Sequence, residues 1–394
     1  MLDLTDYDYN LPADNIALQP LENRYDSRLL VFGGSTKIEH STFRNIANYI
    51  PANSILIRNS TKVIPARLIL HKQTGGAVEL LCIEPILPSN DPQIAMTAMG
   101  SCKWECIVGG RNVNVGMELN ADFLTANILE RYENKAVVEF RWNNNTTFAQ
   151  TIDAIGKIPL PPYIKRDANE DDKYRYQTVY ANIDGSVAAP TAGLHFSQNT
   201  FNALKAKNID IAEVVLHVGP GTFVPIDTSI AEHKMHNEQF FVSRNTIETL
   251  ANNYAKENGF IVATGTTSLR TLESLYWSGV KLLRKEPLGN IAQNYPYSIN
   301  ADYSSEEAFA RLHKYMADNG MDMLNGRTQL FITPGYKIRT INALITNFHL
   351  PKSTLLLLVS AFIGIDNCKQ VYAEALKENY RFLSYGDSSL LMPI

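Results

Sequence analysis

The pattern of hydrophobic and polar positions changes twice along the chain, near residues 67 and 153. Between these points apolar and polar residues alternate in short runs. In the last run Val138, Phe140 and Trp142 share one face of a strand, and charged side chains lie between them. A period of two predicts strands, here over residues 77–83, 103–108, 113–119 and 136–142. We therefore expect residues 67–152 to fold as a small, closed all-β barrel.

From residue 153 onward, helical periods alternate with short apolar strands. Ile247, Leu250 and Tyr254 lie at helical spacing, and Gly259 is expected to end this helix. The next helix is predicted from about Leu269 to Gly279. The other predicted elements are strands over residues 54–58, 260–263, 330–333 and 343–346, a helix opened by the capping box of Ser304 and Glu307, and helices over residues 352–363 and 368–378. This alternation is typical of α/β folds.

The fold prediction is therefore an α/β protein with two domains. A barrel-like α/β main domain, which is also the predicted catalytic domain, is formed by residues 1–66 together with residues 153–394. The β-barrel domain of residues 67–152 is inserted into it.

Composition and charge exclude several classes without naming a function. The chain has 394 residues, of which 45% are hydrophobic and 19% charged, and this excludes a disordered or collagen-like chain. The formal net charge of −4 gives no sign of a nucleic-acid partner, so any basic surface is local. Four cysteines are too few for a disulfide framework. We expect a cytoplasmic protein with no membrane partner, because there is no signal peptide pattern and residues 353–363 are too few to span a bilayer.

Two polar segments suit the edge of an α/β sheet. Residues 59–67 follow the first predicted strand, where polar groups commonly line a crevice; the alternative is a turn with solvated Lys62 and Arg67. Residues 188–196 combine small residues with His195, so the backbone can approach a ligand closely. His195 is a candidate for proton transfer, and the alternative is a structural histidine.

Three of the eight histidines fall close together: His217, His233 and His236. A Gly-Pro-Gly turn follows the first, and Glu238 follows the last. A cluster that transfers protons or holds substrate is the favoured interpretation. Metal ligation by His233, His236 and Glu238 is an alternative whose spacing matches no recognised motif, and a structural turn is another.

The turn at residues 263–270 joins a predicted strand to the next helix. The free N–H groups and the dipole of a helix N-terminus suit an anion or a carboxylate. The hydroxyls of Thr266, Thr267 and Ser268 suit a ribose or a carboxylate, and helix capping is the alternative.

A similar position is predicted for Asn347 and His349, which follow the strand at residues 343–346. Sites in open sheets gather at such strand ends. Asp387 adds a carboxylate in a second turn nearby.

Taken together, these segments resemble one family. The matching motifs are APTAGLHF at 189–196, LHVGPGTF at 216–223, HKMHNE at 233–238, GTTSLR at 265–270, ITNFHLPKSTLLLLVSAFIG at 345–364, YDYNLPADNIALQP at 7–20, STKVIPARL at 60–68, PLPPYI at 159–164 and YRFLSYGDSSLL at 380–391. Over nearly its whole length the chain resembles the S-adenosylmethionine:tRNA ribosyltransferase-isomerases of queuosine biosynthesis.

This resemblance implies an unusual transfer reaction. The ribosyl part of S-adenosylmethionine is transferred to 7-aminomethyl-7-deazaguanine at the tRNA wobble position and isomerised, which gives epoxyqueuosine-tRNA and releases adenine and methionine. The implied partners are S-adenosylmethionine, consumed as a substrate, and tRNA that carries this base. No other cofactor and no metal is implied, and we expect a monomer. The family's α/β domain with an inserted β-barrel agrees with the break in pattern near residue 67.

The same resemblance implies roles for particular residues. The sulfonium makes the C5′ proton acidic enough for a positioned base, and departing adenine needs a proton or a strong donor. The candidate catalytic residues are His195, His217, His233, His236 and His349. The candidate substrate-binding residues are Asn59, Arg67, Thr191, Thr222, Glu238, Thr266, Thr267, Ser268, Arg270, Asn347 and Asp387. We expect His195 and the turn at residues 265–270 to share one pocket.

Three features depart from the family's pattern. The segment of residues 281–327 is longer than expected, Ser60 stands where the family has asparagine, and Asn342 stands where it has aspartate. A catalytically silent or retargeted RNA-binding paralogue is therefore an alternative, and a metal-dependent hydrolase is a further one. For tRNA binding we expect local basic surface from Arg58, Lys62, Arg67, Lys281, Arg284, Lys285, Arg311, His313, Lys314 and Arg327.

Overall fold

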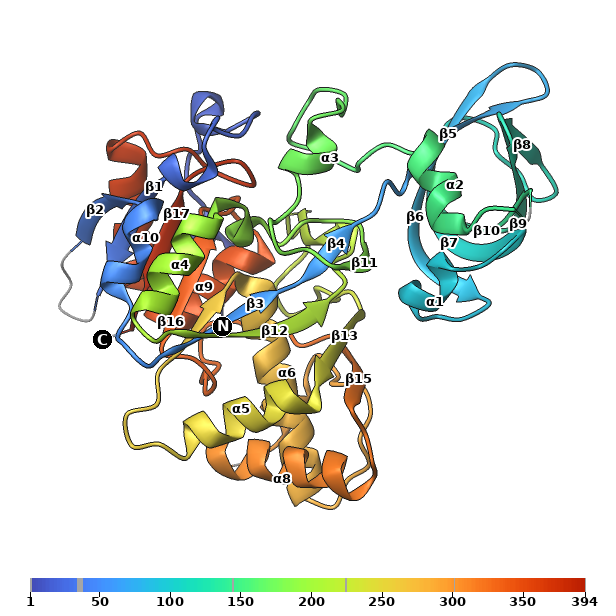
Figure 1. Cartoon of the computed structure of the whole chain (residues 1–394). Coiled ribbons are helices and arrows are strands. Elements are labelled where there is room, and N and C mark those ends of the chain that lie inside the picture. The colour runs from blue at the N-terminus through green and yellow to red at the C-terminus, as the bar shows by residue number, and fades with distance from the viewer. Residues whose placement is uncertain (1, 34–37, 144, 224, 301, 394) are drawn as a thin grey trace.

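A computed structural model describes the chain except for residues 1, 34–37, 144, 224, 301 and 394 and the side chains of residues 222 and 223. It consists of a mixed α/β main body and a closed antiparallel barrel of six strands. Figure 1 shows the barrel, in cyan, at one side of the main body, with β4 (Thr61–Val63) and β11 (Ile183–Ser186) between them. The predicted combination of an α/β body and a β-barrel is thus confirmed.

A nine-stranded sheet forms the centre of the main body. Its order is β15 (Met323–Thr328), β13 (Glu238–Ser243), β12 (Asp210–Leu216), β3 (Ile55–Asn59), β14 (Ile261–Thr264), β16 (Ala343–Asn347), β17 (Ser388–Leu391), β1 (Arg28–Phe32) and β2 (Ile38–Thr42). Strands β12, β3, β14 and β16 run parallel, so their carboxyl ends meet at one edge. Every residue of β14 and β16 is buried, as is typical of parallel strands covered on both faces.

The main sheet is open rather than barrel-like. Antiparallel pairs lie at both ends of the sheet, β13 with β15 and β1 with β2, and no pairing joins β15 to β2 among the described residues. The expectation of a barrel-like body is therefore refined to a mixed open sheet with helices on its faces. Among the described residues no single helix is long and apolar enough to cross a membrane, although the bent pair Thr354–Ile363 and Ile365–Lys377 meets the criteria of length and composition together.

Helices cover the sheet, and several differ from the predicted bounds. They include α4 (Gln198–Ala206), α5 (Arg244–Tyr254), α6 (Thr266–Leu283), α8 (Ser305–Asp318), α9 (Thr354–Ile363) and α10 (Ile365–Lys377). The capping box of Ser304 and Glu307 is present at the start of α8. The helix predicted to reach Gly259 ends at Tyr254. The predicted strand at residues 330–333 does not form among the described residues.

The prediction that Gly279 ends a helix is wrong, since α6 continues to Leu283. Gly279 lies where α6 crosses α8, and a Cβ placed on it would stand 2.2 Å from the carbonyl oxygen of Ala308. The glycine therefore permits close helix packing instead of ending the helix. This contact fixes α6, whose first turn carries several of the candidate site residues.

The barrel consists of strands in the order β10, β7, β6, β5, β8 and β9. Their bounds are β5 (Arg67–Lys72), β6 (Ala77–Leu87), β7 (Ser101–Gly109), β8 (Glu118–Ala121), β9 (Leu124–Tyr132) and β10 (Lys135–Trp142). The sequence pattern missed β5 and β9. The strand predicted at 113–119 begins only at Glu118, as β8, because residues 115–116 form a turn in which Gly116 has a positive φ angle.

An aromatic cluster lies in the core of the barrel. Phe148, the first residue of α2 (Phe148–Ile155), packs its ring against Trp104, Phe140 and Trp142, with ring centroids 5.3–5.5 Å apart. The chain enters and leaves the barrel at adjacent points, where the N–H of Lys157 donates to the carbonyl of Arg67 at 2.8 Å. The exact division of the chain near residues 67 and 152 stays a prediction.

Substitution of Gly279 by alanine tests the packing of α6 on α8. Alanine gains roughly 1 kcal/mol over glycine inside a helix, whereas overpacking costs about 1–3 kcal/mol, and more when backbone must move. Because the contacted atom is backbone, we expect Gly279→Ala to lower the free energy of unfolding in urea denaturation. Gly289→Ala is the control, since a Cβ there meets no atom within 4 Å. A Gly279→Ala protein as stable as the wild type would contradict this account.

Candidate active site

A cavity of about 640 Å³, here called the interdomain cavity, opens between the barrel and the main body. One wall comes from β6, β7 and the turn between β9 and β10. The other comes from residues 217–221 and 233–239 of the main body. Glu84 of β6 forms an ion pair with Arg327 of β15 across this boundary. The volume is in the usual range for small-molecule sites.

His217 enters the interdomain cavity directly after β12. Its Nδ1 lies 2.9 Å from the hydroxyl of Thr61, while its Nε2 is buried and has no hydrogen-bond partner among the described residues. Burial lowers the pKa of His217 to about 4, so the ring is neutral at physiological pH. His217 therefore has one unused polar atom, on a ring that lines the cavity.

Asn59 fixes the backbone around His217 rather than lining the cavity. Its side chain is fully buried. Its amide group donates to the carbonyl of Leu216 at 2.9 Å, and its oxygen accepts from the N–H groups of Leu216 and Thr61 at 3.1 and 3.2 Å. Asn59 is not among the residues that line the cavity, and its contact with substrate stays a prediction.

A buried ion pair joins two of the sequence motifs. Glu238 begins β13 and Arg270 lies in the first turns of α6, and their side chains form an ion pair with 5% and 10% of their surfaces exposed. The N–H of Gly219 also donates to Glu238 at 3.3 Å. Burial lowers the pKa of Arg270 to about 10, which leaves the guanidinium charged at neutral pH. Glu238 lines the interdomain cavity, and Arg270 stands behind it.

His233 and His236 also line the interdomain cavity. Both are more accessible than His217, and burial lowers the pKa of each below its ordinary value. His236 packs on Gly221, where a Cβ would stand 1.9 Å from its Nε2. Within the described part of the chain, no group of three or more His, Cys, Asp or Glu side chains is arranged to hold a metal ion.

His195 lies outside the interdomain cavity, in a separate buried network. Asn347 donates to its Nε2 at 3.1 Å, so its Nδ1 carries the proton and donates to the hydroxyl of Ser27 at 2.8 Å. Burial, with Arg381 and Arg24 nearby, lowers the pKa of His195 to about 3. The hollow beside it holds only about 20 Å³.

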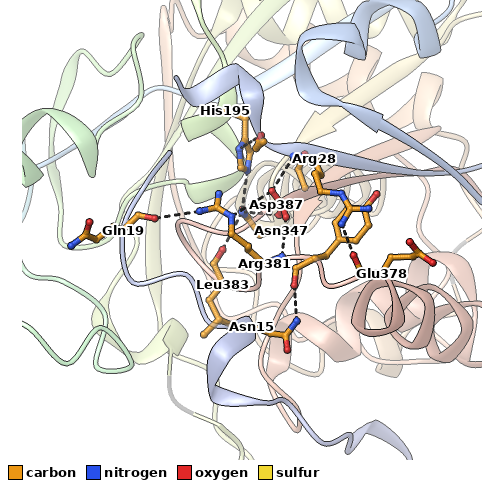
Figure 2. Close-up of polar contacts among 12 residues, drawn as sticks. Asn15, Gln19, Arg28, His195, Asn347, Glu378, Arg381, Leu383 and Asp387 are labelled. Atoms are coloured by element: carbon orange, nitrogen blue, oxygen red, sulfur yellow. Dashed lines mark hydrogen bonds and ion pairs between the residues drawn. The ribbon is translucent and has the colours of Figure 1, made fainter. Parts of the chain in front are cut away.

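Asp387 extends this network, as Figure 2 shows. Its carboxylate accepts from the backbone N–H groups of Arg28 and Arg381 at 2.9 and 2.8 Å, and burial raises its pKa. Asn347 also donates to the carbonyl of Leu383 at 3.2 Å. The network ties β1, β16 and the turn before β17 together, which is a structural arrangement.

The remaining candidates lie in several places. The Nε2 of His349 lies 2.8 Å from the hydroxyl of Thr346, and burial lowers the pKa of His349 to about 3. Thr191 is half-buried and begins the 3₁₀ helix Thr191–His195. The side chain of Thr222 lies outside the described residues. Arg67 pairs with Glu79 at 2.9 Å and lines a second cavity of about 620 Å³.

The turn at the start of α6 lines neither of the two large cavities. Ser268 donates to the carbonyl of Thr264 at 2.7 Å, and the hydroxyl of Thr267 has no partner among the described residues. Thr266 is buried. A Cβ on Gly265 would stand 3.7 Å from Ala192, so the turn adjoins the segment that carries His195. No described cavity contains both His195 and this turn.

Sequence reasoning missed two groups of cavity residues. Glu84, Glu105 and Lys135 line it from the barrel, and alternation along a strand does not mark which polar positions face another domain. Thr61 and Gly185 contact His217. Thr61 lies within the motif STKVIPARL, where it was not singled out, and Gly185 lies just before the motif APTAGLHF. Their contacts with the ring of His217 are visible only in the structure.

Comparison with known proteins gives a consistent family. The family described as "Queuosine biosynthesis protein" matches residues 4–391. A protein from Clostridioides difficile is 38% identical over 98% of this chain and 98% of its own length, and one from Vesicomyosocius okutanii is 41% identical over 99% and 98%; both are named S-adenosylmethionine:tRNA ribosyltransferase-isomerase. A crystal structure of an S-adenosylmethionine tRNA ribosyltransferase from Thermotoga maritima is 31% identical over 98% of this chain and 100% of that chain, with a TM-score of 0.48.

The deeply buried histidines make the folded protein sensitive to acid. The pKa of His349 is about 3 in the folded protein and about 6.5 in an unfolded chain. Between these values the unfolded chain binds a proton that the folded chain does not, so the free energy of unfolding falls as the pH falls below 6.5. We expect the stability advantage of the wild type over His349→Gln to shrink by about 2 kcal/mol from pH 7.5 to pH 5.

Urea denaturation at several pH values measures this difference. His71→Gln, which removes an exposed histidine of the barrel, is the matched control. A pH-independent difference for His349→Gln would show that His349 is not held neutral by burial.

Proposed function

This chain belongs to the family of S-adenosylmethionine:tRNA ribosyltransferase-isomerases of queuosine biosynthesis, and we propose that its reaction takes place in the interdomain cavity. The enzyme transfers and isomerises the ribosyl part of S-adenosylmethionine onto the 7-aminomethyl-7-deazaguanine of tRNA and releases adenine and methionine. The names of the relatives do not favour a silent RNA-binding paralogue or a metal-dependent hydrolase.

One observation carries this placement: His217, His233, His236 and Glu238 line a single cavity of about 640 Å³. A volume of this size accommodates a nucleoside with its attached amino acid. Two domains form its walls, so a small substrate and a nucleotide of a macromolecule can enter from one open side. Both ring nitrogens of His195 and the carboxylate of Asp387 are hydrogen-bonded within the protein, which gives these two residues a structural role in this proposal. Asn347 donates to His195 and to the backbone, and its Oδ1 has no partner among the described residues.

The proposed reaction needs two kinds of group: a base that removes the C5′ proton and a hydrogen-bond donor for the departing adenine. A neutral imidazole is the form that accepts a proton, and His233 and His236 are the more accessible histidines of the cavity. We assign one of them to removal of the C5′ proton, which the adjacent sulfonium acidifies. The carboxylate of Glu238 also lines the cavity, and its ion pair with Arg270 offsets its negative charge. The Nε2 atom of His217 is left for the departing adenine.

A second cavity of about 620 Å³ lies on the other side of Pro220, which lines both. Arg67, Lys165 and Arg166 line it, together with Pro159, Pro161 and Pro162. We propose that the anticodon strand crosses here while the modified base enters the interdomain cavity. Base insertion of this kind removes the nucleotide from its stack.

Several basic residues predicted to contact tRNA are engaged within the protein. Arg58 pairs with Glu213 at 2.6 Å and lies over the ring of Tyr180. Lys62 pairs with Asp184 at 3.0 Å. Lys165 is exposed and has no ion pair among the described residues, so it is the better candidate for a phosphate contact. The proposed setting is a cytoplasmic monomer that uses no cofactor besides its consumed substrate.

Release of adenine from S-adenosylmethionine in the presence of tRNA carrying 7-aminomethyl-7-deazaguanine tests the placement. Loss of one preorganised hydrogen-bond donor to the transition state typically costs about 10²–10³ in kcat, so we expect His217→Ala to lower kcat by about 10² or more. Circular dichroism checks that the variant is folded. His71→Ala, at an exposed position of the barrel, is the matched control. Turnover of His217→Ala within twofold of the wild type would refute the placement.

Lys165→Glu tests the path of the anticodon strand. Loss of one phosphate contact weakens binding and reduces the slope of log affinity against log salt by about 0.7–0.9. We expect weaker binding of an anticodon stem-loop with KM for S-adenosylmethionine unchanged. Lys256→Glu, an exposed charge reversal near the end of α5, is the control. Equal affinities and salt slopes for Lys165→Glu and the wild type would place the strand elsewhere.

A further inference from the structure

We propose that Thr61 is a positioning residue that keeps the proton of His217 on Nε2, so that this atom donates a hydrogen bond to a ring nitrogen of the adenine that leaves S-adenosylmethionine. The inference rests on the proposed function and deepens it. It assigns His217 the role of a neutral hydrogen-bond donor, and it makes Thr61 the residue that determines this role.

The hydrogen-bonding of Thr61 carries the first step. Thr61 is fully buried, and its Oγ1 lies 2.9 Å from Nδ1 of His217. Among the described residues the hydroxyl has no other hydrogen-bond partner. A buried hydroxyl whose proton finds no acceptor is costly, so the Thr61 hydroxyl donates and Nδ1 accepts. In a neutral imidazole the single proton then lies on Nε2.

The surroundings of Nε2 carry the second step. This atom is buried and has no partner among the described residues, although its ring lines the interdomain cavity. A buried N–H without an acceptor is rare in folded proteins, and it is relieved when a ligand supplies one. Adenine presents acceptor nitrogens on its ring, and these gain negative charge as its bond to the ribose breaks.

Two further contacts prevent the ring from turning. The side chain of Asn59 binds the backbone of both Thr61 and Leu216, which precedes His217. On another side lies Gly185, where a Cβ would stand 2.7 Å from Cε1 of His217 and 2.6 Å from Pro92 of α1 (Pro92–Met96). Pro92 belongs to the barrel, so the inserted domain also contributes to the placement of this ring.

A donor aimed at a leaving group acts mainly in the transition state. The hydrogen bond strengthens as charge develops on adenine, so its loss lowers kcat more than it raises KM. His217 donates only a hydrogen bond, and its proton stays on Nε2. The electron pair of the broken bond stays with adenine, which takes up a proton from water after it leaves.

The experiment compares Thr61→Val with Thr61→Ser. Valine has a similar shape and lacks the hydroxyl, whereas serine retains it. We expect Thr61→Val to lower kcat for adenine release about tenfold or more, with KM for S-adenosylmethionine changed less than twofold. Thr61→Ser should stay within about threefold of the wild type. Thr178→Val is the control, because the buried hydroxyl of Thr178 has no hydrogen-bond partner among the described residues.

A second measurement reads the proton position directly. Nitrogen-15 NMR of the histidine rings distinguishes a protonated ring nitrogen from an unprotonated one, and the signals of His217 are those absent in His217→Gln. We expect the proton on Nε2 in the wild type and in Thr61→Ser. The wild-type result alone tests the proposal, so this measurement does not depend on whether a Thr61 variant folds.

The outcomes separate the proposal from the function on which it rests. A proton on Nδ1 of His217 in the wild type overturns the proposal, as does wild-type kcat in Thr61→Val when His217→Ala is inactive. If His217→Ala has the turnover of the wild type, the placement of the reaction in the interdomain cavity is wrong. The assignment of adenine as the acceptor for Nε2 of His217 is then wrong as well.

Discussion

The buried ion pair between Glu238 and Arg270 is the interaction on which the arrangement of the interdomain cavity depends. It joins the start of β13 to the first turns of α6, two segments far apart in sequence. Either charge alone would be strongly unfavourable at this depth, because desolvation is not repaid without a partner. The close crossing of α6 and α8 at Gly279 holds the same helix from its other end. The carboxylate at the cavity wall is therefore fixed by packing and by charge at once.

The barrel has a direct part in the site because its position and that of His217 are coupled. Gly185 separates Pro92 of the barrel from the ring of His217 with no room for a side chain. The ion pair of Glu84 and Arg327 joins the two domains at the cavity. A movement of the barrel would therefore change both the width of the interdomain cavity and the freedom of the ring that faces it.

Local patterns predicted the elements better than they predicted the roles of side chains. Alternation identified β10, and the capping box identified the start of α8, since both depend on neighbouring residues. Gly279 was misread because its reason lies across a helix crossing, and the main sheet was expected to be barrel-like because alternation of elements does not determine closure. The histidine cluster near Glu238 does line one cavity. His195 was assigned to a pocket from its small neighbours, whereas those residues pack beside a network that uses both of its ring nitrogens.

Burial alone does not separate the histidine that we propose to act on the substrate from the other buried histidines. Burial lowers the pKa of His195, His217 and His349 alike, to about 3, 4 and 3, so all three rings are neutral at physiological pH.

The histidines differ in the hydrogen-bond partners of their ring nitrogens. His195 uses both ring nitrogens within the protein, and nothing remains for a ligand. His217 uses Nδ1 alone, and its unused Nε2 belongs to a ring that lines a cavity formed by two domains. An unsatisfied buried group is unfavourable for folding, and binding of an acceptor removes that cost. The number of hydrogen-bond partners, more than the depth of burial, thus distinguishes His195 from His217, the ring that we propose to act on the substrate.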